Sequence, residues 1–226
     1  MEKEAIMATS LENNPDLLYQ RLNMVKSQLE ARQIKDKRVL EAIQTVPRHF
    51  FVPNNLRDRA YADSALPIGY GQTISQPYIV ALMCEAACIS PTDKVLEIGL
   101  GSGYQAAVLG LLSQKVYSIE IVSSLGKLAQ KRLERLGYKN VRIKIGDGYT
   151  GWPEHAPYDA ILITAAAQWV PQPLVDQLAM NGRLIMPIGN NIHQELVRFT
   201  RTKADLKKEM LEPVLFVPFQ SKNFVS

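Results

Sequence analysis

A glycine-rich segment, Gly99-Leu100-Gly101-Ser102-Gly103, directly follows the apolar run Val95-Leu96-Glu97-Ile98. Alternating glycines let the backbone turn tightly and let a ligand approach without interference from Cβ atoms. The dinucleotide fingerprint is Gly-x-Gly-x-x-Gly, and here the third glycine comes one residue early, which weakens an assignment to a pyrophosphate. The segment predicts a loop that binds a nucleotide-like cofactor through Gly99, Gly101, Ser102 and Gly103.

Acidic residues stand where three successive strands are expected to end. Glu97, just before the glycine loop, disfavours an anionic pyrophosphate and suits a cation. Glu120 ends the second strand, where a carboxylate commonly accepts hydrogen bonds from both ribose hydroxyls. Asp147 and Gly148 end the third strand, near the expected place of an adenine edge. S-Adenosyl-L-methionine carries an ammonium and a sulfonium, so the pattern favours this cofactor; the alternative is a surface loop with solvated acids.

Strand and helix patterns alternate over more than half of the chain, which implies a doubly wound, mostly parallel α/β sheet. Two strands near the C-terminus add an antiparallel edge. In such sheets ligands bind beyond the carboxyl ends of the strands, where the glycine loop and the acids are predicted. Gly182 is expected in a turn, and Pro187 is expected to end a strand. The expected strands cover 95–98, 116–119, 141–145, 160–163, 183–186, 195–199 and 214–217, and helices cover 104–112, 123–136 and 173–178.

Helices precede the first of these strands. One is predicted to begin at Asp16 as its N-cap, and a second covers 37–46 and stops before Pro47, because the residue before a proline disfavours helix. The stretch 66–77 reads as a long binding loop without secondary structure of its own. Residues 1–15 are expected to be a flexible lead, and residues 16–226 to form one domain with an N-terminal helical cap over 16–93.

Composition sets the broad class. The chain has 226 residues, with 26 basic and 22 acidic side chains and 46% hydrophobic residues, which suits a globular protein rather than a disordered one. The net charge is +4, and the charged residues of both signs are interspersed along the chain. The stretch 66–77 has no Lys or Arg, so no nucleic-acid partner is expected. Neither a membrane span nor a secretory signal is apparent, and the two cysteines, Cys84 and Cys88, suit a reducing compartment. The expected location is the cytoplasm.

Several motifs together carry a family resemblance. From about Leu17 to Val217 the chain resembles the protein-L-isoaspartate (D-aspartate) O-methyltransferases. The glycine loop is shared by many methyltransferases, whereas the Thr-Ile-Ser-Gln-Pro segment is far more specific to this family. The motifs are Val46-Pro47-Arg48, Leu66-Pro67-Ile68-Gly69, Gly71-Gln72-Thr73-Ile74-Ser75-Gln76-Pro77, Val95-Leu96-Glu97-Ile98-Gly99, Gly101-Ser102-Gly103-Tyr104, Gly146-Asp147-Gly148, Ala156-Pro157-Tyr158-Asp159-Ala160-Ile161, Gly182-Arg183-Leu184 and Pro187-Ile188-Gly189.

The resemblance implies a Rossmann-like methyltransferase fold and an activity. A methyl group would pass from S-adenosyl-L-methionine to the α-carboxylate of an L-isoaspartyl residue in a damaged peptide or protein, leaving S-adenosyl-L-homocysteine. Ser75 is implied as the active-site residue, with Thr73 and Val217 beside the substrate. Ile74 and Ile121 are implied beside the cofactor. No catalytic histidine and no metal are expected, because a carboxylate with an ordinary pKa of about 4 is already ionised at neutral pH.

Two details and several alternatives stay open at this point. Leu100 replaces the small hydroxyl residue usual in the family's glycine loop, and Ser75 would alternatively cap the helix that starts near Pro77. Other functions compatible with the pattern are a methyltransferase acting on RNA or on a small molecule, and a nucleotide-binding module without catalysis. A monomer is expected, with isoaspartyl peptides and proteins as its partners.

Overall fold

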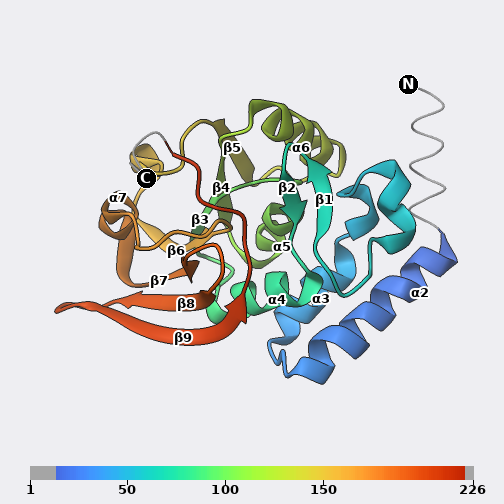
Figure 1. Ribbon diagram of the computed structural model, residues 1–226, viewed down its shortest axis with the longest axis horizontal. Helices are drawn as coiled ribbons and strands as arrows, with labels where there is room; N and C mark the ends of the chain where they lie inside the picture. Colours follow the sequence, from blue (N-terminus) through green and yellow to red (C-terminus); the bar gives the residue numbers. More distant parts are fainter. Residues whose placement is uncertain (1–13, 222–226) are drawn as a thin grey trace.

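The computed structural model describes residues 14–221, and a seven-stranded sheet forms its centre (Figure 1). The strand order is β5-β4-β3-β6-β7-β8-β9. Strands β3 to β7 pair in parallel, and β8 and β9 add antiparallel pairs at one edge. This confirms the doubly wound sheet with an antiparallel edge. The strands are β3 (Lys94–Ile98), β4 (Lys115–Glu120), β5 (Val141–Ile145), β6 (Tyr158–Ile163), β7 (Leu178–Gly189), β8 (Gln194–Arg201) and β9 (Leu206–Val214).

Apolar side chains cover both faces of the sheet. Val95 and Val116 belong to one buried cluster, which also contains residues of the N-terminal helices, whereas Leu96 and Tyr117 belong to a second cluster. Because successive side chains of a strand point to opposite faces, β3 and β4 each contribute to both clusters. The helices that pack around the sheet are α4 (Pro77–Ala86), α5 (Tyr104–Leu112), α6 (Ser123–Arg135) and α7 (Gln172–Asp176).

The N-terminal helices start and stop at local signals. Helix α2 (Pro15–Met24) is capped by Asn14, whose side chain accepts hydrogen bonds from the Asp16 and Leu17 amides, so the expected N-cap at Asp16 is wrong. Asn14 is the better cap because it leaves Pro15 at the first helical position, where its missing N–H costs nothing. The chain continues through the π-helical turn η1 (Val25–Leu29) and the 3₁₀ turn η2 (Glu30–Arg32). Helix α3 (Lys37–Thr45) ends just before Val46 and Pro47, close to the predicted boundary.

The stretch 66–77 is not a structureless loop. Its first part forms a separate antiparallel hairpin, β1 (Leu66–Gly69) with β2 (Gln72–Ile74). The turn passes through Tyr70 and Gly71, both with positive φ. Gly71, which looks like a loop residue in the sequence, is therefore a turn residue of a hairpin, and Gly69 is the last residue of its first strand.

The C-terminal strands differ most from the prediction. β7 runs through Gly182 and past Pro187, which pairs with Leu196 of β8. Proline is tolerated there because the pairing of β7 with β6 ends at Ile185, so no β6 carbonyl requires its N–H. The predicted short helix 173–178 also ends earlier, at Asp176.

The last strand lies earlier in the chain than expected. β9 covers Leu206–Val214 rather than 214–217, and its exposed Lys207, Lys208 and Glu209 gave no strand-like apolar pattern. As the last strand of the sheet, β9 is paired on one side only, so it tolerates the charges that obscured it. The part of the chain expected as a strand, 215–217, instead runs alongside the site described below.

Both cysteines are free thiols, but their settings differ. Cys84 is buried within α4, while Cys88 is exposed beyond the helix end at Ala86, so the two do not share one buried helix face as expected. None of the helices between residues 14 and 221 combines the length and apolar character that spanning a bilayer demands.

Candidate active site

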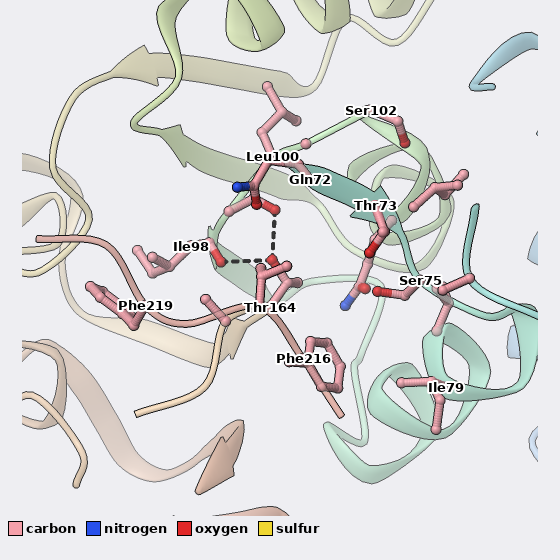
Figure 2. A pocket seen from close by; sticks show the side chains of 18 of the residues that line it. Gln72, Thr73, Ser75, Ile79, Ile98, Leu100, Ser102, Thr164, Phe216 and Phe219 are labelled. Atoms are coloured by element: carbon pink, nitrogen blue, oxygen red, sulfur yellow. Dashed lines mark hydrogen bonds between the residues drawn. The ribbon is translucent and has the colours of Figure 1, made fainter. Parts of the chain in front are cut away.

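A cavity of about 520 Å³ opens at the carboxyl ends of β3, β4 and β6. This volume lies within the range of roughly 300–1,000 Å³ common for small-molecule sites. The glycine loop forms its floor, the β1–β2 hairpin forms one wall, and residues 213–220 form another. Figure 2 shows Thr73 and Ser75 on one side of this space and Ile98 and Phe219 on the other. Segments far apart in the sequence thus meet around one cavity.

Most of the predicted site residues line this cavity. Three do not: Glu97, Gly103 and Asp147 lie outside the lining. Gly103 is the N-cap of α5, and Asp147 accepts hydrogen bonds from the Tyr149 amide at 2.9 Å and the Ser221 hydroxyl at 2.8 Å. The predicted residues that do line it are Thr73, Ile74, Ser75, Gly99, Gly101, Ser102, Glu120, Ile121, Gly148 and Val217.

Backbone hydrogen bonds to β4 fix the shape of the glycine loop. The amides of Gly99 and Leu100 both donate to the carbonyl oxygen of Ile119, at 2.9 and 3.2 Å. The Glu120 carboxylate accepts from the Gly101 amide at 2.7 Å and from the Val122 amide at 2.9 Å. These contacts hold Glu120, which is only 4% exposed, at the cavity edge. Its oxygens retain lone pairs for a ligand hydroxyl.

Gly99 has a structural reason to be glycine. Its φ is +96°, and a Cβ atom at this position would overlap the Thr164 hydroxyl. That hydroxyl hydrogen-bonds the carbonyl oxygens of Gly99 at 2.8 Å and Ile98 at 3.1 Å, as the dashed lines in Figure 2 show. Thr164 therefore joins the end of β6 to the glycine loop.

Thr164 and Phe216 were missed by the sequence analysis, whereas the neighbouring Val217 was expected beside the substrate and does line the cavity. Thr164 directly follows β6, so the strand-end rule points to it, but only acidic strand ends were considered. Phe216 was assigned to a strand. In the structure the Gln194 side chain holds its backbone, accepting from the Phe216 amide at 2.6 Å and donating to its carbonyl at 3.2 Å. Next to it, the Val217 carbonyl accepts from the Ala166 amide at 2.8 Å.

Glu97 has a different environment from Glu120. It is completely buried, accepts a hydrogen bond from the Ser118 hydroxyl, and its Oε1 has no hydrogen-bond partner among the described residues. Burial, reinforced by the negative charge of Glu120 and opposed by the Ser118 hydrogen bond, raises the pKa of Glu97 to about 8. Burial therefore favours the protonated form of Glu97, which lies on β3 just before the glycine loop.

The Ser75 hydroxyl is available for a ligand. Ser75 is half-buried and lines the cavity, and its side chain makes no hydrogen bond within residues 14–221. The alternative role as a helix cap is wrong, because Gln76 occupies the N-cap position of α4 and no side chain caps this helix. Pro77 at the first helical position has no N–H to cap.

Comparison with known proteins identifies the family. The family model "Protein-L-isoaspartate(D-aspartate) O-methyltransferase (PCMT)" matches residues 20–224. The chain belongs to this family. A protein-L-isoaspartate O-methyltransferase from Picosynechococcus sp. is 54% identical over 204 residues, covering 90% of this chain and 91% of that protein. One from Synechococcus sp. is 57% identical over 206 residues, covering 88% and 84%.

A solved structure supports the same membership in the protein-L-isoaspartate O-methyltransferase family. A Plasmodium falciparum protein described as a member, in complex with S-adenosyl-L-homocysteine, superposes with a TM-score of 0.77 at 27% identity, covering 88% of this chain and 98% of that chain. The expected Rossmann-like methyltransferase fold and the family resemblance are confirmed. As a PCMT family member the chain is a methyltransferase.

Proposed function

We propose that this chain transfers a methyl group from S-adenosyl-L-methionine to the α-carboxylate of L-isoaspartyl residues in damaged peptides and proteins. Family membership supports the activity. The observation that carries the proposal is that one cavity is lined both by the glycine loop and by Ser75, whose hydroxyl is free of hydrogen bonds to the described residues. A cofactor and an acceptor carboxylate therefore have adjoining places in one cavity.

The cavity residues fit S-adenosyl-L-methionine. Glu120 offers carboxylate lone pairs to the ribose hydroxyls, while Ile98, Ile121 and Gly148 offer an apolar surface for adenine. The glycine loop approaches without Cβ atoms and suits the methionyl part. When bound, the cofactor supplies an electrophilic methyl group on a sulfonium. Gly103 and Asp147, and the buried Glu97, support the cofactor site from outside its lining in this proposal.

The hairpin wall positions the acceptor. Ser75 donates a hydrogen bond to the substrate carboxylate and so aims one of its oxygens at the methyl group, with Thr73 on the same wall and Val217 on the opposite one. Because the carboxylate is ionised at neutral pH, no residue of the chain has to remove a proton. The attack neutralises an anion and a cation, so alignment and exclusion of water supply most of the rate. Phe216 and Ile79 contribute to that exclusion.

The methyl ester then repairs the chain without further help. The backbone amide nitrogen that follows the residue attacks the ester carbonyl, a proton and methoxide leave together as methanol, and a succinimide closes. Addition of water opens the succinimide partly to normal aspartate. The enzyme therefore has only to form the ester.

The same proposal includes partners and location. We propose that the chain acts as a monomer in the cytoplasm, on isoaspartyl peptides and proteins and without a nucleic-acid or membrane partner. Two free cysteines suit a reducing compartment, and the hairpin wall carries no basic side chain for a phosphate backbone. Size-exclusion chromatography with light scattering should report the mass of one chain, 25.3 kDa. A doubled mass would contradict the proposed monomer.

A labelled-methyl assay tests the proposed function. The chain is incubated with labelled S-adenosyl-L-methionine and one of three acceptors: an isoaspartyl peptide, its aspartyl twin, or RNA. We expect base-labile label on the isoaspartyl peptide alone. Label on RNA or on the aspartyl twin alone would replace the proposal by another methyltransferase activity, and cofactor binding without any transfer would indicate a non-catalytic module.

A further inference from the structure

Five arginines that do not line the cavity gather without an acidic partner among residues 14–221. They are Arg21 on α2, Arg48 in the 3₁₀ turn η3 (Arg48–Phe50), Arg57 in the 3₁₀ turn η4 (Asn54–Arg59), and Arg132 and Arg135 on α6. The ion pairs found within residues 14–221 involve other arginines. We call these five residues the arginine cluster. None of them lines the cavity.

Electrostatic effects connect Arg57, Arg132 and Arg135 with one another, and connect Arg21 and Arg57 with His49, which directly follows Arg48 in the chain. Burial and the positive charges of Arg135 and Arg57 lower the pKa of Arg132. Burial and the charges of Arg21 and Arg57 lower the pKa of His49 to about 4, so His49 is neutral and adds no charge at pH 7. Arginine remains protonated under these conditions, so like charges are held close together.

Arg48 lies at the base of the arginine cluster. It is completely buried, its Nε donates to the Ala60 carbonyl at 2.7 Å, and its guanidinium lies 4.9 Å from the Tyr104 ring centroid. Its Nη1 and Nη2, like Nε2 of the neighbouring His49, have no hydrogen-bond partner among the described residues. A buried guanidinium without a counter-charge is costly, and an anion bound above it would offset part of that cost.

The outer guanidinium groups are held in place. Arg132 lies 5.7 Å from the Phe51 ring and donates through Nη1 to the Ser102 carbonyl at 2.6 Å. Arg135 lies 5.8 Å from the Phe50 ring. Aromatic surfaces beneath a guanidinium restrict its motion, which lowers the entropy lost when a ligand binds. The Nε atoms of Arg21 and Arg57 are buried and also lack partners within the described residues, while both side chains remain partly exposed.

We propose that the arginine cluster is a binding site for a small anion of the polyphosphate class, such as pyrophosphate or tripolyphosphate. The planar fork of a guanidinium matches two oxygens of a phosphate, and several arginines together match a ligand with several negative charges better than a single carboxylate. Arg21, Arg57 and Arg135 reach solvent and contact the ligand, and Arg48 adds its charge from below. The five arginines do not line the methyl-transfer cavity, although Arg132 and Arg48 contact Ser102 and Tyr104, which do. The proposed anion site does not depend on the proposed activity.

Isothermal titration of the full-length chain with sodium tripolyphosphate, at fixed ionic strength and without S-adenosyl-L-methionine, tests this site. We expect saturable binding of one ion per chain. Arg57→Gln with Arg135→Gln should weaken it at least tenfold. The matched control, Lys127→Gln with Lys131→Gln, removes the same charge from exposed positions of α6 and should change the affinity less than twofold. No saturable binding, or equal weakening by both double variants, would overturn the proposal.

Thermal unfolding separates ligand binding from a structural role. Without ligand, Arg57→Gln with Arg135→Gln should leave the melting temperature unchanged or raise it, because repulsion between like charges is relieved. Tripolyphosphate should raise the melting temperature of the unaltered chain and not that of this variant. A fall of several degrees in the ligand-free variant would assign the arginines to structure instead. Displacement of tripolyphosphate by a short RNA at far lower concentration would make a nucleic acid the ligand and also overturn the proposal.

Discussion

The floor and the hairpin wall of the cavity are built in different ways. On the floor, the amides of Gly99 and Leu100 bond to β4, and Glu120 accepts from the next part of the loop. The hairpin wall pairs only with itself, as a two-stranded sheet separate from the main one. Its second strand ends at Ile74, and the hydroxyl of the next residue, Ser75, makes no hydrogen bond within the described chain. The main sheet thus fixes the glycine loop on the floor of the cavity, while the hairpin wall keeps polar groups available to bind the methyl-accepting substrate.

The largest effect on the glycine loop, the floor of the cavity, is expected from Gly99→Ala. The added Cβ would overlap the Thr164 hydroxyl, and the residue has a φ of +96° that disfavours alanine. A strain of roughly 3 kcal/mol, relieved by moving the loop, would weaken cofactor binding about hundredfold. Calorimetric titration with S-adenosyl-L-homocysteine measures this. Gly137→Ala is the control, since Gly137 has a φ of +81° but open space around it and lies outside the cavity. An equal loss of cofactor affinity in both variants would contradict the role of the glycine loop in binding the cofactor.

Ser75→Ala should impair the contact of the hairpin side of the cavity with the substrate and leave the glycine loop, and so cofactor binding, unchanged. Loss of a hydrogen bond to a charged acceptor, about 1.5–3 kcal/mol, lowers kcat/KM for an isoaspartyl peptide roughly tenfold to hundredfold. The dissociation constant for S-adenosyl-L-homocysteine should not change. Ser124→Ala, at an exposed position of α6, makes the same chemical change elsewhere and should keep full activity. Full turnover in Ser75→Ala would remove this residue from the mechanism.

Glu120→Gln, next to the glycine loop, should weaken cofactor binding less than Gly99→Ala does. The amide keeps one acceptor oxygen, but its NH₂ group would face one of the two backbone amides that now donate to Glu120. We expect cofactor binding about tenfold weaker, equal to about 1.4 kcal/mol, with peptide KM little altered. Glu134→Gln, on the exposed side of α6, is the matched control. An unchanged cofactor affinity in Glu120→Gln would argue against a ribose contact.

Glu97→Gln should change how the stability of the fold depends on pH. The pKa of Glu97 is raised by burial to about 8 from a usual value of 4.5, so the folded chain holds a proton that the unfolded chain releases between these pH values. The free energy of unfolding should therefore fall as pH rises from about 4.5 to 8, by at most about 1.4 kcal/mol per pH unit. Glu97→Gln has no such proton and should show a shallower dependence in urea unfolding. Identical pH profiles for both chains would contradict a buried, protonated Glu97.

Several regular elements of the main sheet and its helices were predictable because their signals are local. Helix α5 was predicted at its observed bounds, Tyr104–Leu112, and β5 at Val141–Ile145, since apolar periodicity and flanking glycines mark them. The hairpin wall was mistaken for a loop, because residues such as Tyr70 and Gly71 occur both in long loops and in the turn of a short hairpin. β9 was misplaced because Lys207 and Lys208 on a sheet edge carry no apolar pattern.

The sequence by itself determined the family, the parallel sheet and ten of the residues that line the cavity, because these depend on motifs and periodicities that occupy short stretches of chain. Only the tertiary structure separated Glu97, buried and with a raised pKa, from Glu120 at the cavity edge, although both are acids at strand ends. It also brought Thr164 to the glycine loop and assembled the arginine cluster from three distant segments. Burial and contacts between remote segments set these properties, and neither is encoded in local spacing.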